Sequence, residues 1–158
     1  MNANSAGCLF TNGQYILAGL QIKNGHKIIS GIGGRCEEDE DSIHNAIRET
    51  IEELFEIYDV PEVIDEILIH YIPRRFITNN TYTILVYTFE DLLDFVKIIE
   101  SYHLYSPIYE TFPKSMEDFL LKRTPTPSSE IKALVLLPND VEMSLDPLFL
   151  SDLVLLNQ

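Results

Sequence analysis

The first part of the chain alternates short apolar runs with turn residues. Residues 6–10 and 15–21 are rich in residues that favour strands, and a Thr-Asn-Gly turn at 11–13 joins them. A second turn, of the Asn-Gly kind, follows at 23–25. We therefore expect a beginning built of hairpins. Residues 31–34 (Gly-Ile-Gly-Gly) then predict a loop in which the backbone comes close to another group.

After residue 41 the apolar period becomes helical. The positions that recur at helical spacing are Ile43, Ala46, Ile47, Thr50 and Leu54. Asp41 or Ser42 is available as the N-cap. Residues 43–55 are therefore predicted to form a helix whose apolar face packs on a sheet.

Beyond this helix the pattern predicts a second pair of strands and a mixed remainder. Residues 64–72 and 82–89 are interpreted as an antiparallel pair. Residues 90–129 have a helical pattern and a stiff Thr-Pro-Thr-Pro exit, which predicts a helical insertion or lid. Residues 131–137 are expected to form a further strand, and residues 147–156 a terminal helix. Strands and helices mixed in this order indicate a single α+β domain that spans the whole chain of 158 residues.

Three carboxylates stand together on the predicted helix. Glu49, Glu52 and Glu53 are spaced i, i+3 and i+4, which places them on one side of about one turn, opposite the apolar stripe. Glutamates on a helix are most often a solvated face. Three like charges this close also repel one another and raise each other's pKa. A hard divalent cation with oxygen ligands would compensate for that repulsion.

The charge of the whole chain restricts its partners. Asp and Glu number 25 against 11 Lys and Arg, which gives a formal net charge of −14, whereas proteins that capture nucleic acid need a basic face. No apolar run approaches the roughly 20 residues that span a bilayer, and residues 1–7 lack the features of a signal peptide. We expect a soluble, cytoplasmic protein with no membrane partner, in which Cys8 and Cys36 are reduced, structural thiols.

The charged positions of residues 34–56 follow a fixed spacing. They are Gly34, Glu40, Arg48, Glu49, Glu52 and Glu53. At these positions the chain resembles the Nudix hydrolase family, whose signature is G-x5-E-x7-R-E-U-x-E-E-x-G-U, with U an apolar residue. Phe55 stands where the signature has its last glycine, and Glu56 where it has an apolar residue. We therefore expect the helix to continue, or to end by another geometry near residues 58–61.

The resemblance implies a fold and a metal site. The fold would be the α/β/α sandwich of the family, with a mixed sheet. The implied ligands of Mg²⁺ or Mn²⁺ are the carbonyl of Gly33 and the carboxylates of Glu49, Glu52, Glu53 and Glu130. Glu52 is the first choice as primary ligand. Glu49 binds metal or acts as the general base, while Arg48 orients a neighbouring glutamate and pairs with Glu40.

The resemblance also implies an activity. A metal-activated water would attack one phosphorus of a nucleoside diphosphate linked to another group, X, and Glu49 or Glu53 would accept the proton. The motif does not identify X. Arg35, Arg74 and Arg75 are the best candidates for phosphate clamps in a chain with few cations, against the alternative of ordinary surface ion pairs.

Two alternatives stay open at this point. The missing glycine and the helix-containing segment before the last strand resemble small viral decapping Nudix proteins, which makes the cap of mRNA the second candidate substrate. The other alternative is a Nudix-like module that binds ligands without hydrolysing them. Such modules usually lack a catalytic glutamate, whereas Glu49, Glu52 and Glu53 are all present here. Residues 90–129 would shape the substrate site or form the contact of a homodimer.

Overall fold

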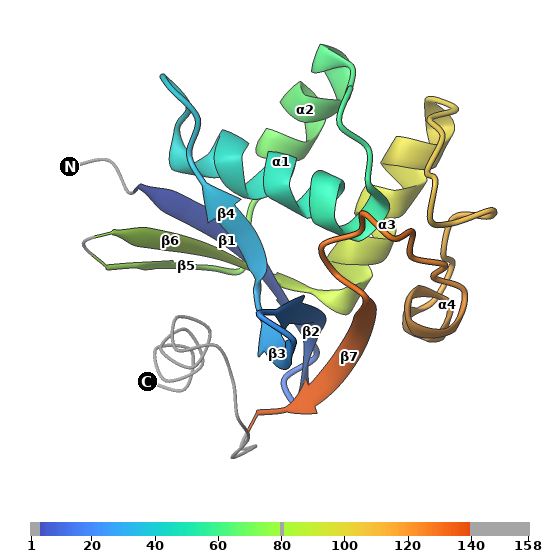
Figure 1. The fold of residues 1–158 in the computed structure, drawn as a ribbon. Helices are drawn as coiled ribbons and strands as arrows, with labels where there is room; N and C mark the ends of the chain where they lie inside the picture. The colour runs from blue at the N-terminus through green and yellow to red at the C-terminus, as the bar shows by residue number, and fades with distance from the viewer. Residues whose placement is uncertain (1–3, 80, 140–158) are drawn as a thin grey trace.

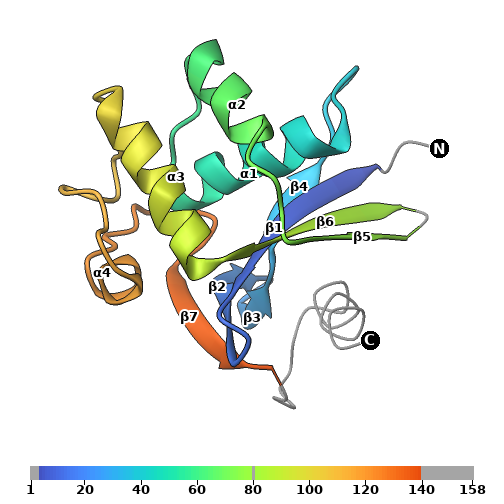
Figure 2. The same ribbon diagram turned by 180° about the vertical axis from the view of Figure 1, so that it is seen from behind.

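The computed structural model describes residues 4–79 and 81–139 (Figures 1 and 2). The strands in this part are β1 (Ser5–Thr11), β2 (Tyr15–Lys23), β3 (His26–Ser30), β4 (Ile32–Arg35), β5 (Arg75–Thr78), β6 (Tyr82–Thr88) and β7 (Ala133–Pro138). The helices are α1 (Ser42–Phe55), α2 (Glu62–Ile69), α3 (Phe89–Ser101) and α4 (Met116–Leu121). None of the helices in the described ranges is long and apolar enough to cross a membrane.

The strands form one mixed sheet around β1. Its order is β3-β2-β1-β6-β5, with β4 paired to β1 and β7 paired to β2. The pair β1 and β6 is parallel, from Ser5 opposite Tyr82 to Thr11 opposite Thr88, and every other pair is antiparallel. The α+β class and the mixed sheet are thus confirmed.

The hairpins at the beginning of the chain are confirmed, and one predicted strand is wrong. Asn24 and Gly25 take positive φ between β2 and β3, as a two-residue hairpin turn requires. Residues 64–72 were expected to be a strand, but helix α2 covers most of them. Ile64 and Leu68 are both buried and stand one helical turn apart. The antiparallel partner of β6 is instead β5.

The main core lies between the sheet and the helices α1, α2 and α3, which gather on one face (Figures 1 and 2). Alternate residues of β1, Ala6, Cys8 and Phe10, point into it, while Leu9 belongs to a second apolar cluster. The predicted terminal helix at 147–156 lies outside the described residues.

Residues 90–129 contribute directly to the main core. Helix α3 begins with a complete capping box at Thr88 and buries Leu92, Phe95, Val96 and Ile99. Farther along, the side chain of Ser115 accepts from the N–H of Asp118 and caps α4. The chain between α3 and β7 packs beside the end of α1 (Figure 1), where Phe119 is fully buried.

Candidate active site

Helix α1 carries the predicted carboxylates and begins where the sequence predicts. The carboxylate of Asp41 accepts a hydrogen bond from the backbone N–H of His44 and so caps the first turn. The apolar face, with Ala46 and Leu54 fully buried, packs against β1 and β4. The helix is thereby fixed to the strand that contains the glycine-rich stretch.

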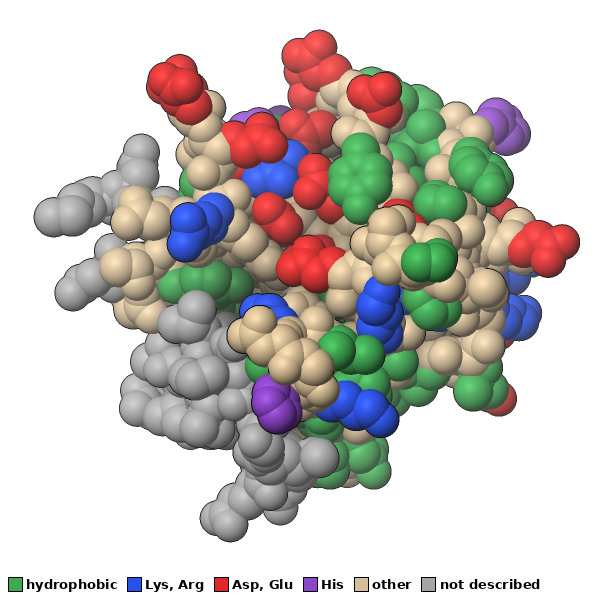
Figure 3. Space-filling view, in the orientation of Figure 1, with side chains coloured by type: hydrophobic (Ala, Val, Ile, Leu, Met, Phe, Trp, Pro, Cys, Tyr) green, Lys and Arg blue, Asp and Glu red, His purple; other side chains and the backbone are tan. Residues whose placement is uncertain are grey.

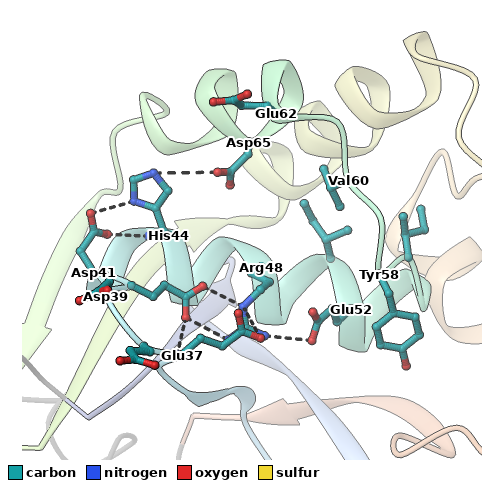
Figure 4. A pocket seen from close by; sticks show the side chains of 14 residues that line it. Glu37, Asp39, Asp41, His44, Arg48, Glu52, Tyr58, Val60, Glu62 and Asp65 are labelled. Atoms are coloured by element: carbon teal, nitrogen blue, oxygen red, sulfur yellow. Dashed lines mark hydrogen bonds and ion pairs between the residues drawn. The ribbon is translucent and has the colours of Figure 1, made fainter.

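Arg48 ties two of the carboxylates on α1 to the loop before the helix, and Figure 4 shows its contact with one of them, Glu52. Its Nε donates to Glu40 Oε1 at 2.8 Å and its Nη2 to Glu40 Oε2 at 3.0 Å, a bidentate pair. Its Nη1 donates to Glu49 Oε1 at 3.0 Å and to Glu52 Oε2 at 3.1 Å. The expected pair of Arg48 and Glu40 is therefore present, and the same guanidinium holds both Glu49 and Glu52 in place.

A buried amide that we did not single out in the sequence completes this arrangement. Asn45 is fully buried; its Oδ1 accepts from Arg48 Nη2 at 2.9 Å, and its Nδ2 donates to the carbonyl of Gly34 at 3.0 Å. Arg48 Nη2 also donates to the carbonyl of Arg35 at 3.1 Å. The sequence signal was an asparagine among the apolar positions of the helix, since a buried amide needs partners.

Two glycines of β4 allow neighbouring groups to come close to the backbone. A Cβ on Gly34 would lie 2.5 Å from Glu49 Oε1, and a Cβ on Gly33 would lie 2.6 Å from the carbonyl oxygen of Ala6. Any side chain at Gly34 would therefore displace the carboxylate of Glu49. The predicted close approach of the backbone is real, although residues 32–35 form a strand and not a loop.

A small pocket brings the four predicted carboxylate ligands together, and Gly33 is not among its described lining residues. Its volume is about 50 Å³, and it is lined by Glu49, Glu52, Glu53, Glu56, Tyr58, Glu130 and Ile131. We call it the carboxylate pocket. Glu130, which lies just before β7, thus reaches the three glutamates of α1. The side chain of Glu53 is the deepest: the residue is 9% exposed, and its Oε2 has no hydrogen-bond partner in the described part of the chain.

The electrostatics of this pocket favour a bound cation. Burial, together with the charges of Glu130 and Glu49, raises the pKa of Glu53 to about 9, against a hydrogen bond from the Gly33 N–H. Burial also raises the pKa of Glu49, in opposition to Arg48. Carboxylates that share a dry site destabilise one another's charged form, and a cation relieves that cost.

The donor set suits a hard divalent cation. Within residues 4–79 and 81–139 no three His, Cys, Asp or Glu side chains already stand as a ligand set. However, the unpartnered Oε2 of Glu53 is a buried oxygen that lacks a donor or a cation, and its neighbours in the pocket offer only further oxygens. Carboxylate oxygens are the ligands that Mg²⁺ and Mn²⁺ prefer. The residues present therefore fit such a metal.

A larger pocket, lined in part by Arg48, adjoins the carboxylate pocket. It encloses about 540 Å³, a size that suits a small-molecule ligand, between the loop at 37–41, α1 and α2 (Figure 4). Glu52 and Tyr58 line both pockets. Acidic side chains gather in the upper part of the face that Figure 3 shows, and Arg48 is the single Arg or Lys among the described residues of the lining.

The three arginines predicted to clamp phosphate lie elsewhere. Arg74 pairs through Nη2 with Asp91 Oδ1 at 3.0 Å, at the start of α3. Arg75 begins β5, and Arg35 ends β4. In the described part of the chain neither pocket is lined by any of the three. Their binding of phosphate stays a prediction.

Helix α1 ends at Phe55, and its C-cap differs from the glycine cap of the signature. Glu56 adopts the left-handed conformation, with φ 52° and ψ 40°, and its N–H donates to the carbonyl of Glu52. The helix therefore does not continue to residues 58–61. Phe55 is itself buried, and its ring lies within 6.0 Å of those of Tyr109 and Phe119.

Comparison with known proteins gives only distant structural similarity. No family model and no curated protein matches the sequence. Among solved structures, the chain is similar to a bifunctional NMN adenylyltransferase/ADP ribose pyrophosphatase from Francisella tularensis, crystallised with AMP and a Mn ion (TM-score 0.45, 14% identity, 98% of this chain and 37% of that one). A second structure of that enzyme gives a TM-score of 0.43 and 14% identity, over 97% of this chain and 36% of the other. This chain thus spans little more than a third of that enzyme.

A NUDIX family hydrolase from Clostridium perfringens is similar over nearly its whole length, with 98% of this chain and 95% of that one covered. Its TM-score is 0.41 and its identity 13%. The TM-scores of all three structures lie below 0.5.

Proposed function

We propose that this protein is a metal-dependent pyrophosphohydrolase of the Nudix type, acting on a nucleoside diphosphate linked to a further group. The observation that carries the proposal is the carboxylate pocket, in which Glu53 presents a buried, unpartnered oxygen beside Glu49, Glu52 and Glu130. The spacing of residues 34–53 in the sequence supports the same conclusion independently. The larger adjoining pocket offers room for the substrate.

The residues of the site would hold the metal, orient the carboxylates or accept the proton, and Glu53 belongs to both the first and the last of these groups. Glu52, Glu53 and Glu130 would hold Mg²⁺ or Mn²⁺, with the Gly33 carbonyl as a further proposed ligand. When bound, the metal would neutralise phosphate charge and acidify water. Arg48 keeps Glu52 and Glu49 oriented through the hydrogen bonds of its Nη1.

The hydrolysis needs one proton acceptor. The oxygen of water forms a bond to one phosphorus while the bond from that phosphorus to the bridging oxygen breaks, and the proton of the water goes to a carboxylate. Glu49 and Glu53 are the two pocket carboxylates whose pKa is raised, first of all by burial, which makes them better bases than an exposed glutamate. The proton then leaves with the phosphorylated products.

Neither alternative gains support from the site. A capped RNA would bring many phosphates, whereas Arg48 is the one Arg or Lys in the described lining of the larger pocket, and it is engaged by carboxylates. A binding module without hydrolysis would have no use for a general base beside three further carboxylates. We therefore propose hydrolysis of a small, nucleotide-type substrate.

A panel of diphosphate substrates tests this proposal. We would incubate dNTPs, ADP-ribose, NADH, dinucleoside polyphosphates and capped RNA with wild-type protein and Mg²⁺ or Mn²⁺, beside Glu52→Gln and the control Glu117→Gln, an exposed carboxylate of α4. We expect turnover of a small substrate, a loss of about 100-fold or more in Glu52→Gln and none in Glu117→Gln. Full activity of Glu52→Gln would refute the site, and wild-type protein that releases no product would favour the binding module.

A further inference from the structure

The last turn of α1 is the part of the site that the sequence signature leaves unexplained. The last four carbonyls of a helix have no partner within the helix and must find one elsewhere. Here the carbonyl of Glu52 accepts from the N–H of Glu56 at 2.8 Å. The carbonyls of Glu53, Leu54 and Phe55 therefore need donors from another part of the chain.

All three donors come from the segment between α3 and β7. Arg123 Nη1 donates to the carbonyl of Leu54 at 2.7 Å, and Nη2 donates to the carbonyl of Glu53 at 2.9 Å. Ser106 Oγ donates to the carbonyl of Phe55 at 2.6 Å. Every terminal carbonyl of α1 thus has a partner, although no glycine caps the helix.

Arg123 also reaches the second element of the carboxylate pocket. Its Nη2 donates to the carbonyl of Ile131 at 3.4 Å. Ile131 directly follows Glu130, and Glu53 and Glu130 line the same pocket. One guanidinium therefore joins the backbone beneath two carboxylates that lie far apart in the sequence.

The guanidinium is itself held firmly. Arg123 is only 9% exposed, and its Cζ lies 5.9 Å from the centre of the Tyr109 ring. The hydroxyl of Tyr109 donates in turn to the carbonyl of Phe119 at 2.8 Å. A buried cation at the C-terminus of a helix is also favoured by the helix dipole. Arg123 is thus positioned and held so that it can fix the distance between the backbone at Glu53 and the backbone at Ile131.

We propose that Arg123 is a positioning residue for the carboxylate pocket. By binding the carbonyls of Glu53 and Ile131 from behind, it sets the separation of the Glu53 and Glu130 side chains and so determines how tightly they hold a divalent cation. This inference rests on the proposed function, because it assigns a purpose to the pocket. It also gives part of the segment at 90–129 a role behind the site, away from the substrate.

Mn²⁺ binding to the full chain, measured by the loss of the free-ion EPR signal, tests the role of Arg123 without any turnover. The variants are Arg123→Lys and Arg123→Met. Lysine keeps the charge but lacks the planar fork that spans two carbonyls. We expect both variants to bind Mn²⁺ about 10-fold or more weakly than wild type, the usual effect of removing a group that orients metal ligands.

Ser106→Ala is the matched control. It removes a buried hydrogen bond from the same helix end, but from Phe55, which does not line the carboxylate pocket. We expect a lower melting temperature with wild-type Mn²⁺ affinity. If Ser106→Ala weakens Mn²⁺ binding as much as Arg123→Lys does, the effect is general loosening and the positioning role is refuted.

The two proposals fail in different ways. If wild-type protein binds no Mn²⁺, or if Glu53→Gln binds Mn²⁺ as well as wild type does, the proposed function is overturned and the role of Arg123 with it. If wild type binds Mn²⁺ and Glu53→Gln does not, wild-type affinity in Arg123→Lys overturns the role of Arg123 alone. Should Arg123→Met not fold by circular dichroism, Arg123→Lys, which keeps the buried charge, supplies the comparison.

Discussion

Arg48→Met should destabilise the fold by a predictable amount. Methionine keeps an apolar side chain of similar length but removes a guanidinium that contacts Glu40, Glu49 and Glu52. The side chains of Arg48 and Glu40 are 22% and 12% exposed. Removing one partner of a buried pair typically costs about 3–5 kcal/mol, and because this pair retains some exposure we expect about 3 kcal/mol.

The effect of Arg48→Met should depend on pH. Burial raises the pKa of Glu40, but the hydrogen bonds from Arg48 and from the Glu37 N–H outweigh it, so this pKa lies below its ordinary value. The stability that the pair contributes is therefore present above the pKa of an unfolded glutamate and is lost as pH falls through the lowered pKa. In Arg48→Met, burial still raises the pKa of Glu40, but the hydrogen bonds from Arg48 no longer lower it. Protonation of Glu40 in acid then removes its buried, unpaired charge. The gap between wild type and variant should narrow as pH falls.

Urea unfolding followed by far-UV circular dichroism measures this difference. With a slope of about 2 kcal/mol per M, a loss of 3 kcal/mol lowers the midpoint by about 1.5 M at pH 7. Lys97→Met is the control, because its ion pair with Asp94 is exposed and spans 3.9 Å. A midpoint for Arg48→Met that equals that of the control, or a gap that widens in acid, would refute this reasoning.

Three further variants follow from the same contacts. Gly34→Ala should abolish metal-dependent turnover in a protein that still folds, because the new Cβ would lie 2.5 Å from Glu49 Oε1; wild-type kinetics would contradict this. Phe55→Ala should cost about 3–5 kcal/mol in urea unfolding, and Phe55→Gly should not be more stable than wild type, although glycine restores the signature. Burial raises the pKa of Asp91, but hydrogen bonds that include those of Arg74 hold this pKa below its ordinary value. Asp91→Asn should therefore be less stable than wild type at pH 7, and the two stabilities should converge as pH falls through the lowered pKa. A difference in stability that stays constant with pH would count against the ion pair of Asp91 and Arg74.

The sequence predicted α1 closely because its signals are local. Asp41 is an N-cap and the apolar positions keep one period over four turns, so the predicted helix at 43–55 and the observed Ser42–Phe55 nearly coincide. Helix α2 was missed because its β-branched residues resemble a strand over a short window. Its buried residues, Ile64 and Leu68, are one helical turn apart, and this spacing is the signal that favours a helix over a strand.

The site was predictable only as far as the motif and the family resemblance extend. Spacing alone placed Glu49, Glu52 and Glu53 on one side of a helix, the resemblance implied Glu130, and all four line the same pocket in the structure. Arg123 lies about 70 residues from the carbonyls of α1 that it binds, and no local pattern marks it. Contacts of this kind depend on how segments pack, which the order of residues does not display.

The measurement that tests the central claim most directly is hydrolysis in ¹⁸O-labelled water. With Mg²⁺ or Mn²⁺ and a substrate that it hydrolyses in the panel, wild-type protein should place ¹⁸O on one phosphorylated product. Removal of the metal with EDTA should stop the reaction. Glu52→Gln should incorporate ¹⁸O at a rate that is lower by about 100-fold or more. Turnover that survives EDTA, or label found on carbon instead of phosphorus, would contradict metal-dependent attack of water on a diphosphate.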